Sequence, residues 1–316
     1  MENSGKKRTI WAIGGGKGGT GKSFVASSIG TYLALKGSKT ILIDADLGGA
    51  NLHTFLGVSK PRYSLTDFFD KNISLNEVVF HTGIANLEII TGSIGSLDSE
   101  SITYTQKQKL LRHIRALDAE HIIIDLGAGV HFNTLDTFLL ADKMIVVTAP
   151  EITALENMYQ FIKSVYFRKL KLIFKTYDLN STLQETWKNR TSYNIRSLKE
   201  LISHFKNSSD QVRGIFDREF SGFVVHIVLN QVRTPGDITV GENLKSVCRN
   251  FLGLPVVFAG YIRYDAAVQK NINNKEPFML FSRLSPVVKE ITKVTENIVA
   301  GGDLSVQKDP VNGRVS

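Results

Sequence analysis

Short runs of β-branched and other apolar residues alternate with helical patterns over the first 150 residues of the chain. We predict strands over 8–15, 39–45, 86–92, 121–127 and 143–149, and helices over 23–37, 105–117 and 132–142. The run from 122 to 124 is apolar without alternation, as expected for a strand that is buried on both faces. This alternation predicts an α/β fold with a doubly wound, mostly parallel sheet and right-handed crossovers.

The pattern changes after a predicted helix over 151–167. The following 50 or so residues (168–220) contain no clear strand, but amphipathic stretches predict helices over 197–205 and 211–220. Strands and helices then resume over 222–230, 241–253, 255–262 and 285–300. We therefore interpret 166–220 as a helical insertion within one domain that covers residues 1–300. The polar tail 301–316 has no apolar face and is expected to be disordered.

The amino-acid composition says more about the cellular compartment of the protein than about its function. A net charge of +8 permits contact with nucleic acid or anionic lipid but establishes neither. A single cysteine, Cys248, excludes an intrachain disulfide or a multi-cysteine cluster and favours a reducing compartment. We find no signal-peptide pattern and no apolar stretch long enough to span a membrane. We expect a cytoplasmic protein.

A phosphate-binding loop follows the first predicted strand. The stretch 16–23, GKGGTGKS, matches the pattern G-x-x-x-x-G-K-S/T and opens a helix, which is the context that this motif requires. Glycines let backbone N–H groups converge on phosphate oxygens, Lys22 would reach the β- and γ-phosphates, and Ser23 would bind Mg²⁺. The residues expected to contact the nucleotide here are Gly16, Lys17, Gly18, Gly19, Thr20, Gly21, Lys22, Ser23 and Phe24.

The second lysine of the loop, Lys17, resembles the early lysine in the deviant Walker A loop of the MinD/ParA family of dimerising ATPases. The resemblance extends over 8–165 and 222–300. It implies ATP or ADP and Mg²⁺ as cofactors and an ATP-dependent homodimer in which Lys17 reaches the nucleotide of the partner subunit. A lysine suits this role because it is a long, flexible point charge. A solvated lysine on a loop is the alternative.

Two acids lie at the end of the second predicted strand. Asp44 and Asp46 are two residues apart at a strand end, so both point toward the ligand crevice of an α/β sheet. The resemblance implies that Asp46 orients the attacking water and acts in catalysis with Lys17 and Lys22, and that Asp44 supports the metal. It also places Asn51 near the nucleotide and the dimer contact. In the alternative, Asp44 caps a helix and Asp46 is a surface acid.

A third acid, Asp125, follows the apolar run 122–124 and matches the Walker B acid that holds Mg²⁺ through water. The glycines after it, Gly127 and Gly129, would let the loop move with the γ-phosphate. Relatives often have proline or threonine just after this acid, whereas Leu126 and Gly127 follow here, which leaves the switch geometry open.

The base side of the site is expected at the ends of the last two strands. The resemblance implies that Asn230 hydrogen-bonds the adenine edge, since an amide both donates and accepts. In the alternative, this amide at the end of a strand has a structural role. The stretch 259–277 resembles the family's G-x-I-P-x-D segment, but Arg263 replaces the proline. The resemblance therefore implies contact with the base only for Asp265 and the backbone near Ile262.

Within the family, the stretches 44–52, 151–165 and 261–272 are most similar to the FlhG (FleN) branch, which regulates flagellar number, and to the MinD branch. Both branches usually end in a basic amphipathic helix that binds membrane, and the tail here cannot form one. The predicted helix 285–300 has an apolar stripe. We expect this stripe to face the core of the protein. Peripheral, transient contact with the inner face of the cell membrane is the alternative.

These features favour an ATP-dependent switch that positions or counts a cellular structure, with segment 166–220 as the surface for a protein partner. The alternative is a ParA-like DNA-partitioning protein that binds DNA non-specifically through the basic segment. That segment contains eleven Lys and Arg and six Asp and Glu, hence a balance of +5. A nucleotide-binding module without turnover is disfavoured by intact Lys22, Asp46 and Asp125. One cysteine excludes the iron–sulfur branches, and the absence of tyrosine after Tyr264 excludes the tyrosine-kinase branch.

Overall fold

One eight-stranded sheet forms the centre of the molecule. The computed structural model describes residues 8–46, 49–59, 61–71, 73–92, 104–253 and 255–302. Its strands are β1 (Thr9–Gly14), β2 (Thr40–Asp44), β3 (Phe80–His81), β4 (Leu87–Ile90), β5 (His121–Asp125), β6 (Lys143–Thr148), β7 (Val225–Val232) and β8 (Val256–Arg263). They lie in the order β3-β4-β2-β5-β1-β6-β7-β8, and every neighbouring pair is parallel except β3 and β4. This topology confirms the predicted doubly wound, mostly parallel α/β fold.

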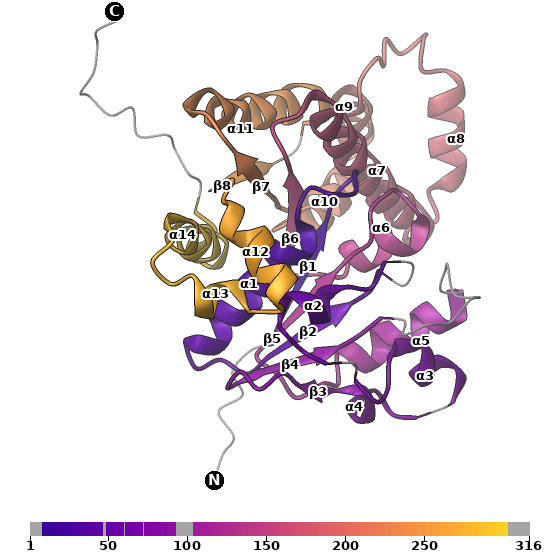
Figure 1. Cartoon of the computed structure of the whole chain (residues 1–316). Helices are drawn as coiled ribbons and strands as arrows, with labels where there is room; N and C mark the ends of the chain where they lie inside the picture. Colours follow the sequence, from indigo (N-terminus) through magenta and orange to yellow (C-terminus); the bar gives the residue numbers. More distant parts are fainter. Residues whose placement is uncertain are drawn as a thin grey trace, which may run out of the picture.

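Helices cover both faces of the sheet (Figure 1). The first half of the chain contains α1 (Lys22–Leu35), α2 (Leu52–Phe55), α3 (Leu65–Asp70), α4 (Leu75–Val78), α5 (Tyr104–Ile114), α6 (Phe132–Phe138) and α7 (Ile152–Thr176). The second half contains α8 (Asn180–Lys188), α9 (Leu198–Ser208), α10 (Asp210–Glu219), α11 (Pro235–Val247), the π-turn Cys248–Leu252, α12 (Ala266–Asn274), α13 (Phe278–Phe281) and α14 (Pro286–Ala300).

Alternating side chains of the strands enter two separate apolar cores. Ile10 and Ala12 of β1 face the core that α3 to α7 and α9 to α11 cover. Trp11 and Ile13 face the other core, which α1, α2, α13 and α14 cover. Figure 1 shows the C-terminal helices α12, α13 and α14 gathered beside α1. Because the sheet is buried on both faces, its central strands are apolar without interruption, as the sequence predicts.

Every predicted strand is present, whereas several short elements were not predicted from the pattern. The two-residue strand β3 and the four-residue helices α2, α4 and α13 span only about one period of their patterns, too little for a periodicity to show in the sequence. Helix α11 begins at Pro235, earlier than predicted, because Thr234 and Asp237 form a capping box with proline at the first helical position. Helix α7 continues to Thr176 as one helix of 25 residues.

The predicted insertion, 166–220, consists of the last turns of α7 followed by α8, α9 and α10. Helices α9 and α10 pack on α7 through aromatic rings. Phe174 lies 4.6 Å from Phe205 and 6.0 Å from Phe216, measured between ring centroids, and all three rings are buried. Helix α8 lies at the outer edge of the molecule (Figure 1). Most of this segment is therefore part of the main core, and only α8 projects from it.

The apolar stripe of the last helix faces the core. Val287, Ile291, Val294 and Ile298 are at most 2% exposed and pack in the core beside α1. The core-facing interpretation of this stripe is therefore confirmed. In the described part of the chain, no helix combines the length and apolar character needed to cross a membrane.

Candidate nucleotide-binding site

The loop between β1 and α1 ends in Gly21, a glycine in the left-handed region. Gly21 has a φ of 89° and directly precedes Lys22, the first residue of α1. A Cβ built on Gly21 would lie 2.1 Å from Asn230 Nδ2. Both the backbone conformation and the available space therefore require glycine here. The loop thus turns tightly into α1, with the N-terminus of the helix at its mouth.

Helix α7 packs directly against the other side of this loop. A Cβ on Gly16 would lie 2.0 Å from the backbone oxygen of Asn157. A Cβ on Gly14 would lie 2.8 Å from the ring of Phe161. These contacts between backbone and helix leave no room for a side chain. The glycines of this loop therefore serve packing as well as the approach of a phosphate.

The end of β7 holds the loop from the opposite side. Asn230 Nδ2 donates to Thr20 O and Gln231 Nε2 donates to Gly19 O, both at 2.9 Å. Neighbouring side chains of a regular strand point to opposite faces, but β7 has one additional residue between its pairings with Tyr261 and Arg263. Gln231, with a φ of 61°, absorbs this bulge. Both amides can therefore reach the same loop.

Asn230 thus has the structural role that was the alternative to base binding, and it also lines the pocket described below. Its contact with an adenine edge stays a prediction. Gln231 was missed, because nothing in the strand pattern indicates a bulge at this position.

Lys22 is buried at the centre of the site. Lys22 is only 8% exposed, and its Nζ donates to Lys17 O at 3.3 Å. Burial lowers the pKa of Lys22, and the nearby Asp125 and Asp46 partly oppose that shift. A buried ammonium next to acids on one side and an open pocket on the other is suited to bind a phosphate.

Two buried acids end the neighbouring strands β2 and β5. Asp44 and Asp125 pair in register across these strands and are 1% and 2% exposed. Burial raises the pKa of both carboxyls above the usual range, and at Asp125 the repulsion from Asp44 adds to the effect. Asp44 accepts hydrogen bonds from the backbone N–H groups of Asp46 and Leu52, at 3.2 and 3.0 Å. Its carboxylate therefore shapes the loop that carries Asp46 and Asn51.

Asp125 has an unused oxygen. Its Oδ1 is buried and has no hydrogen-bond partner among the described residues, while the side chain interacts with the Ser23 hydroxyl. A carboxylate, a serine hydroxyl and phosphate oxygens are the donors with which Mg²⁺ is commonly held in P-loop proteins. These residues therefore fit the ion that the sequence predicts, with Asp44 behind them as a support.

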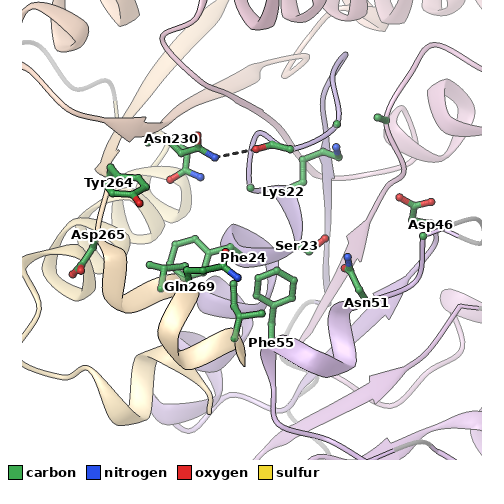
Figure 2. Close-up of a pocket in the computed structure, with 18 of the residues that line it drawn as sticks. Lys22, Ser23, Phe24, Asp46, Asn51, Phe55, Asn230, Tyr264, Asp265 and Gln269 are labelled. Carbon is green, nitrogen blue, oxygen red and sulfur yellow. Dashed lines mark hydrogen bonds between the residues drawn. The ribbon is translucent and has the colours of Figure 1, made fainter. Parts of the chain in front are cut away.

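An open pocket of 430 Å³ lies in front of these groups, within the range of about 300–1,000 Å³ that is usual for ligand sites. Figure 2 shows Lys22 and Ser23 between Asn230 and Tyr264 on one side and Asp46 and Asn51 on the other. Of the predicted residues, those that line it are Gly18, Gly19, Gly21, Lys22, Ser23, Phe24, Asp46, Asn51, Asn230 and Asp265. Those that the sequence analysis missed are Gly49, Phe55, Ala128, Gln231, Arg263, Tyr264, Val268, Gln269 and Ile272.

The remaining predicted residues lie behind or beside the pocket. Gly16 packs on α7, Thr20 is buried, and Ile262 is fully buried in a core cluster, so only its backbone could approach a base. Asp265, which lines the pocket, also caps α12 through the N–H of Ala267 at 2.8 Å and accepts from the Ser285 hydroxyl at 2.7 Å. Gly129, with a φ of 106°, donates its N–H to Gly15 O at 3.3 Å. This bond joins the loop after β5 to the phosphate-binding loop.

Lys17 points away from the pocket that its own loop surrounds. Its Nζ forms an ion pair with Glu151 at 3.0 Å and a hydrogen bond with the Thr153 hydroxyl at 2.9 Å. Both partners lie at the start of α7. The two lysines of the loop therefore have different surroundings, because Lys22 is buried in the site and Lys17 is partly exposed at its rim.

The parallel sheet, the glycine loop before α1 and the acid at the end of β5 define a P-loop nucleotide-binding fold. A family model described as "CobQ/CobB/MinD/ParA nucleotide binding domain" matches residues 11–278. The chain belongs to this family. The resemblance to the MinD/ParA family is thereby confirmed.

Curated proteins that are similar in sequence support this assignment. The septum site-determining protein MinD of Escherichia coli K12 is 31% identical over 150 residues, which are 47% of this chain and 55% of that protein. The chain thus spans about half the length of the curated relatives that it matches.

Among solved structures, MinD from Pyrococcus horikoshii OT3, complexed with Mg-ADP, has a TM-score of 0.61 at 21% identity and covers 93% of this chain and 98% of its own. A ParA family ATPase from Chlorobium tepidum has a TM-score of 0.62 at 17% identity, over 92% and 99%. At these identities the structures show a shared fold.

Gly16→Ala tests the packing of the loop on α7. We expect the substitution to lower the free energy of unfolding of the nucleotide-free protein by about 1–3 kcal/mol, because the new Cβ displaces the backbone at Asn157. The matched control is Gly18→Ala, where a Cβ meets nothing within 4 Å. Urea denaturation measures both, and equal effects of the two substitutions would contradict this packing.

The raised pKa of Asp125 predicts a pH-dependent cost in the protein free of Mg²⁺ and nucleotide. Above pH ~4 an unfolded aspartate loses its proton while the folded one retains it, so the stability contributed by this group falls as the pH rises toward its folded pKa. We expect Asp125→Asn to become more stable relative to wild type between about pH 5 and 8, by up to ~1.4 kcal/mol per pH unit.

Urea denaturation across this pH range measures the difference. Asp70→Asn, at an exposed position at the end of α3, is the control and should give a curve parallel to that of wild type. A parallel curve for Asp125→Asn as well would show that the buried carboxyl titrates normally.

Proposed function

We propose that the chain is an ATP-dependent switch in which Mg-ATP brings two copies together and hydrolysis separates them. The observation that carries this proposal is that the two lysines of one loop point to different places. Lys22 already faces the pocket, whereas Lys17 is held at the rim by Glu151 and Thr153. A second subunit at this rim would place a nucleotide within reach of a lysine that its own subunit does not use.

Exposed apolar side chains lie on the segments next to that rim. Val130, Phe132 and Ile152 are 47%, 64% and 75% exposed, and Ile152 lies between the two residues that hold Lys17. The loop that contains Val130 is joined to the phosphate-binding loop through the Gly129–Gly15 hydrogen bond. Apolar side chains clustered at the edge of a site are typical of a surface that another protein covers. We assign this surface to the second copy.

Within each subunit, the described residues divide the chemistry of hydrolysis. Lys22 and the backbone of the loop would hold the β- and γ-phosphates, while Ser23 and Asp125 would hold Mg²⁺, which neutralises the charge that develops on the phosphates. Asp46, on a loop shaped by Asp44, would orient the attacking water from the opposite wall of the pocket. Such catalysis depends on positioning and electrostatics, so Lys17 from the partner would complete it.

Pairing with Glu151 gives the single subunit a resting state for Lys17. The ion pair is partly exposed, with side-chain exposures of 37% and 62%, so it costs little to break. We propose that Lys17 leaves Glu151 when the second copy arrives.

The cellular role that we propose is control of the position or number of a cellular structure, as in the FlhG and MinD branches, with a protein partner at 166–220. The DNA-partitioning alternative has less support, because at least four of the eleven cations in this segment are in ion pairs. These pairs are Arg168–Asp136, Lys169–Glu219, Lys206–Asp217 and Arg213–Asp210. DNA binding that weakens steeply with salt would favour the alternative.

The solution mass in each nucleotide state tests the switch. We expect wild type to be monomeric with ADP and dimeric with Mg-ATP, and Asp46→Ala to accumulate as a dimer with Mg-ATP because it holds ATP without hydrolysing it. Lys17→Ala should stay monomeric in both states. Light scattering after size exclusion measures the mass, and a wild-type mass that ignores the nucleotide would refute the proposal.

A further inference from the structure

A second pocket, of 230 Å³, lies between α7 and the segment that joins α8 to α9. It shares no residue with the nucleotide pocket. Tyr159, Lys163 and Phe167 of α7 follow each other at intervals of four residues and so form one stripe of the helix. The rest of the lining comes from Trp187, Arg190, Ile195, Arg196, Ser197, Leu198 and Leu252.

Apolar and aromatic side chains form part of this lining. Ile195, Leu198 and Leu252 are buried, at 8%, 6% and 1% exposure. The rings of Phe167 and Trp187 are perpendicular, with centroids 6.3 Å apart, and Trp187 is 46% exposed. An exposed indole in a concave site offers a face on which a planar ring can stack, and such stacking is insensitive to the identity of the base.

The charges of this lining are all positive. Lys163, Arg190 and Arg196 contribute three cations, and no carboxylate lines the pocket. Arg190 lies over the Trp187 ring, 5.1 Å from its centroid. Lys163 has no side-chain ion pair among the described residues, whereas the Glu200 carboxylate lies close enough to Arg196 for the two charges to interact. Three cations around an aromatic pocket favour an anion, and guanidinium groups favour phosphate in particular.

The backbone N–H groups at the start of α9 are partly occupied by a side chain of the same helix. The Glu200 carboxylate accepts from the backbone N–H groups of Arg196 and Ser197, at 2.5 and 2.9 Å, and the Ser197 hydroxyl accepts from the N–H of Glu200. A capping box thus occupies the N–H groups of Arg196, Ser197 and Glu200, and its carboxylate disfavours an anion at this helix start. Recognition of the anion therefore depends on the side chains of Lys163, Arg190 and Arg196.

We propose that this pocket binds a mononucleotide, with its base against Trp187 and Phe167 and its phosphate among Lys163, Arg190 and Arg196. The volume is below the ~300–1,000 Å³ of sites that enclose a whole drug-sized ligand, so it suits one planar ring with the anionic group at the mouth. The proposed site is separate from the nucleotide pocket, with which it shares no residue.

Tryptophan fluorescence reports on this pocket directly, because the chain has two tryptophans and the other, Trp11, is completely buried. The full chain is titrated with AMP, GMP, CMP or UMP, and each titration is repeated in Lys22→Ala, in which the nucleotide pocket is disabled. We expect saturable quenching by at least one of them. The matching nucleoside and inorganic phosphate should each bind about tenfold more weakly or less, since each has only half of the recognised chemistry.

Lys163→Ala and Arg196→Ala should each weaken this binding about tenfold, as expected for loss of a contact between a cation and a phosphate. The control is Lys175→Ala, which removes the same charge from α7 outside this pocket. Trp187→Phe should remove the signal but retain binding by calorimetry. Absence of saturable quenching with all four mononucleotides, equal affinity for phosphate alone, or unchanged affinity in both cation variants would overturn the proposal. Normal ATP-dependent dimers alongside that outcome would leave the proposed switch intact.

Discussion

Helix α7 can lie against the phosphate-binding loop only because Gly16 carries no side chain, and this contact organises much of the molecule. The same helix presents Glu151 and Thr153 to Lys17 at its start and packs on α9 and α10 through Phe174 near its end. On the other side, the amides of Asn230 and Gln231 hold the carbonyls of the loop. The loop therefore has its shape before any phosphate arrives, which is the preorganisation that electrostatic catalysis requires.

Buried charge is the second constraint. Asp44 and Asp125 are held at the ends of neighbouring strands with raised pKa values, and the one buried lysine nearby has a lowered pKa. A nucleotide-free site of this kind costs stability, and a divalent cation with phosphates would relieve that cost. Ligand binding and the order of the site are therefore coupled, as expected of a protein whose state follows its nucleotide.

Features that depend on neighbouring residues in the sequence could be predicted. The apolar runs predict the seven longer strands, and the glycine loop with Lys22, Ser23 and Asp125 follows from residue spacing alone. Gln231, Tyr264 and the Lys17–Glu151 pair could not be predicted, because a bulge in β7 and the approach of α7 depend on contacts between distant segments. The structural partner of Asn230 was missed for the same reason.

A mixture of two inactive variants tests most directly whether each active site needs both subunits. In a two-fold dimer of Lys17→Ala with Asp46→Ala, one site would have its own Asp46 together with Lys17 of the other subunit, so it would be complete. The account predicts that the equimolar mixture hydrolyses ATP although each variant alone does not. The variants are mixed before Mg-ATP is added and one carries a mass tag, so that mixed dimers are detected. Where mixed dimers form, turnover no higher than that of the separate variants would show that Lys17 does not act on the nucleotide of a second subunit.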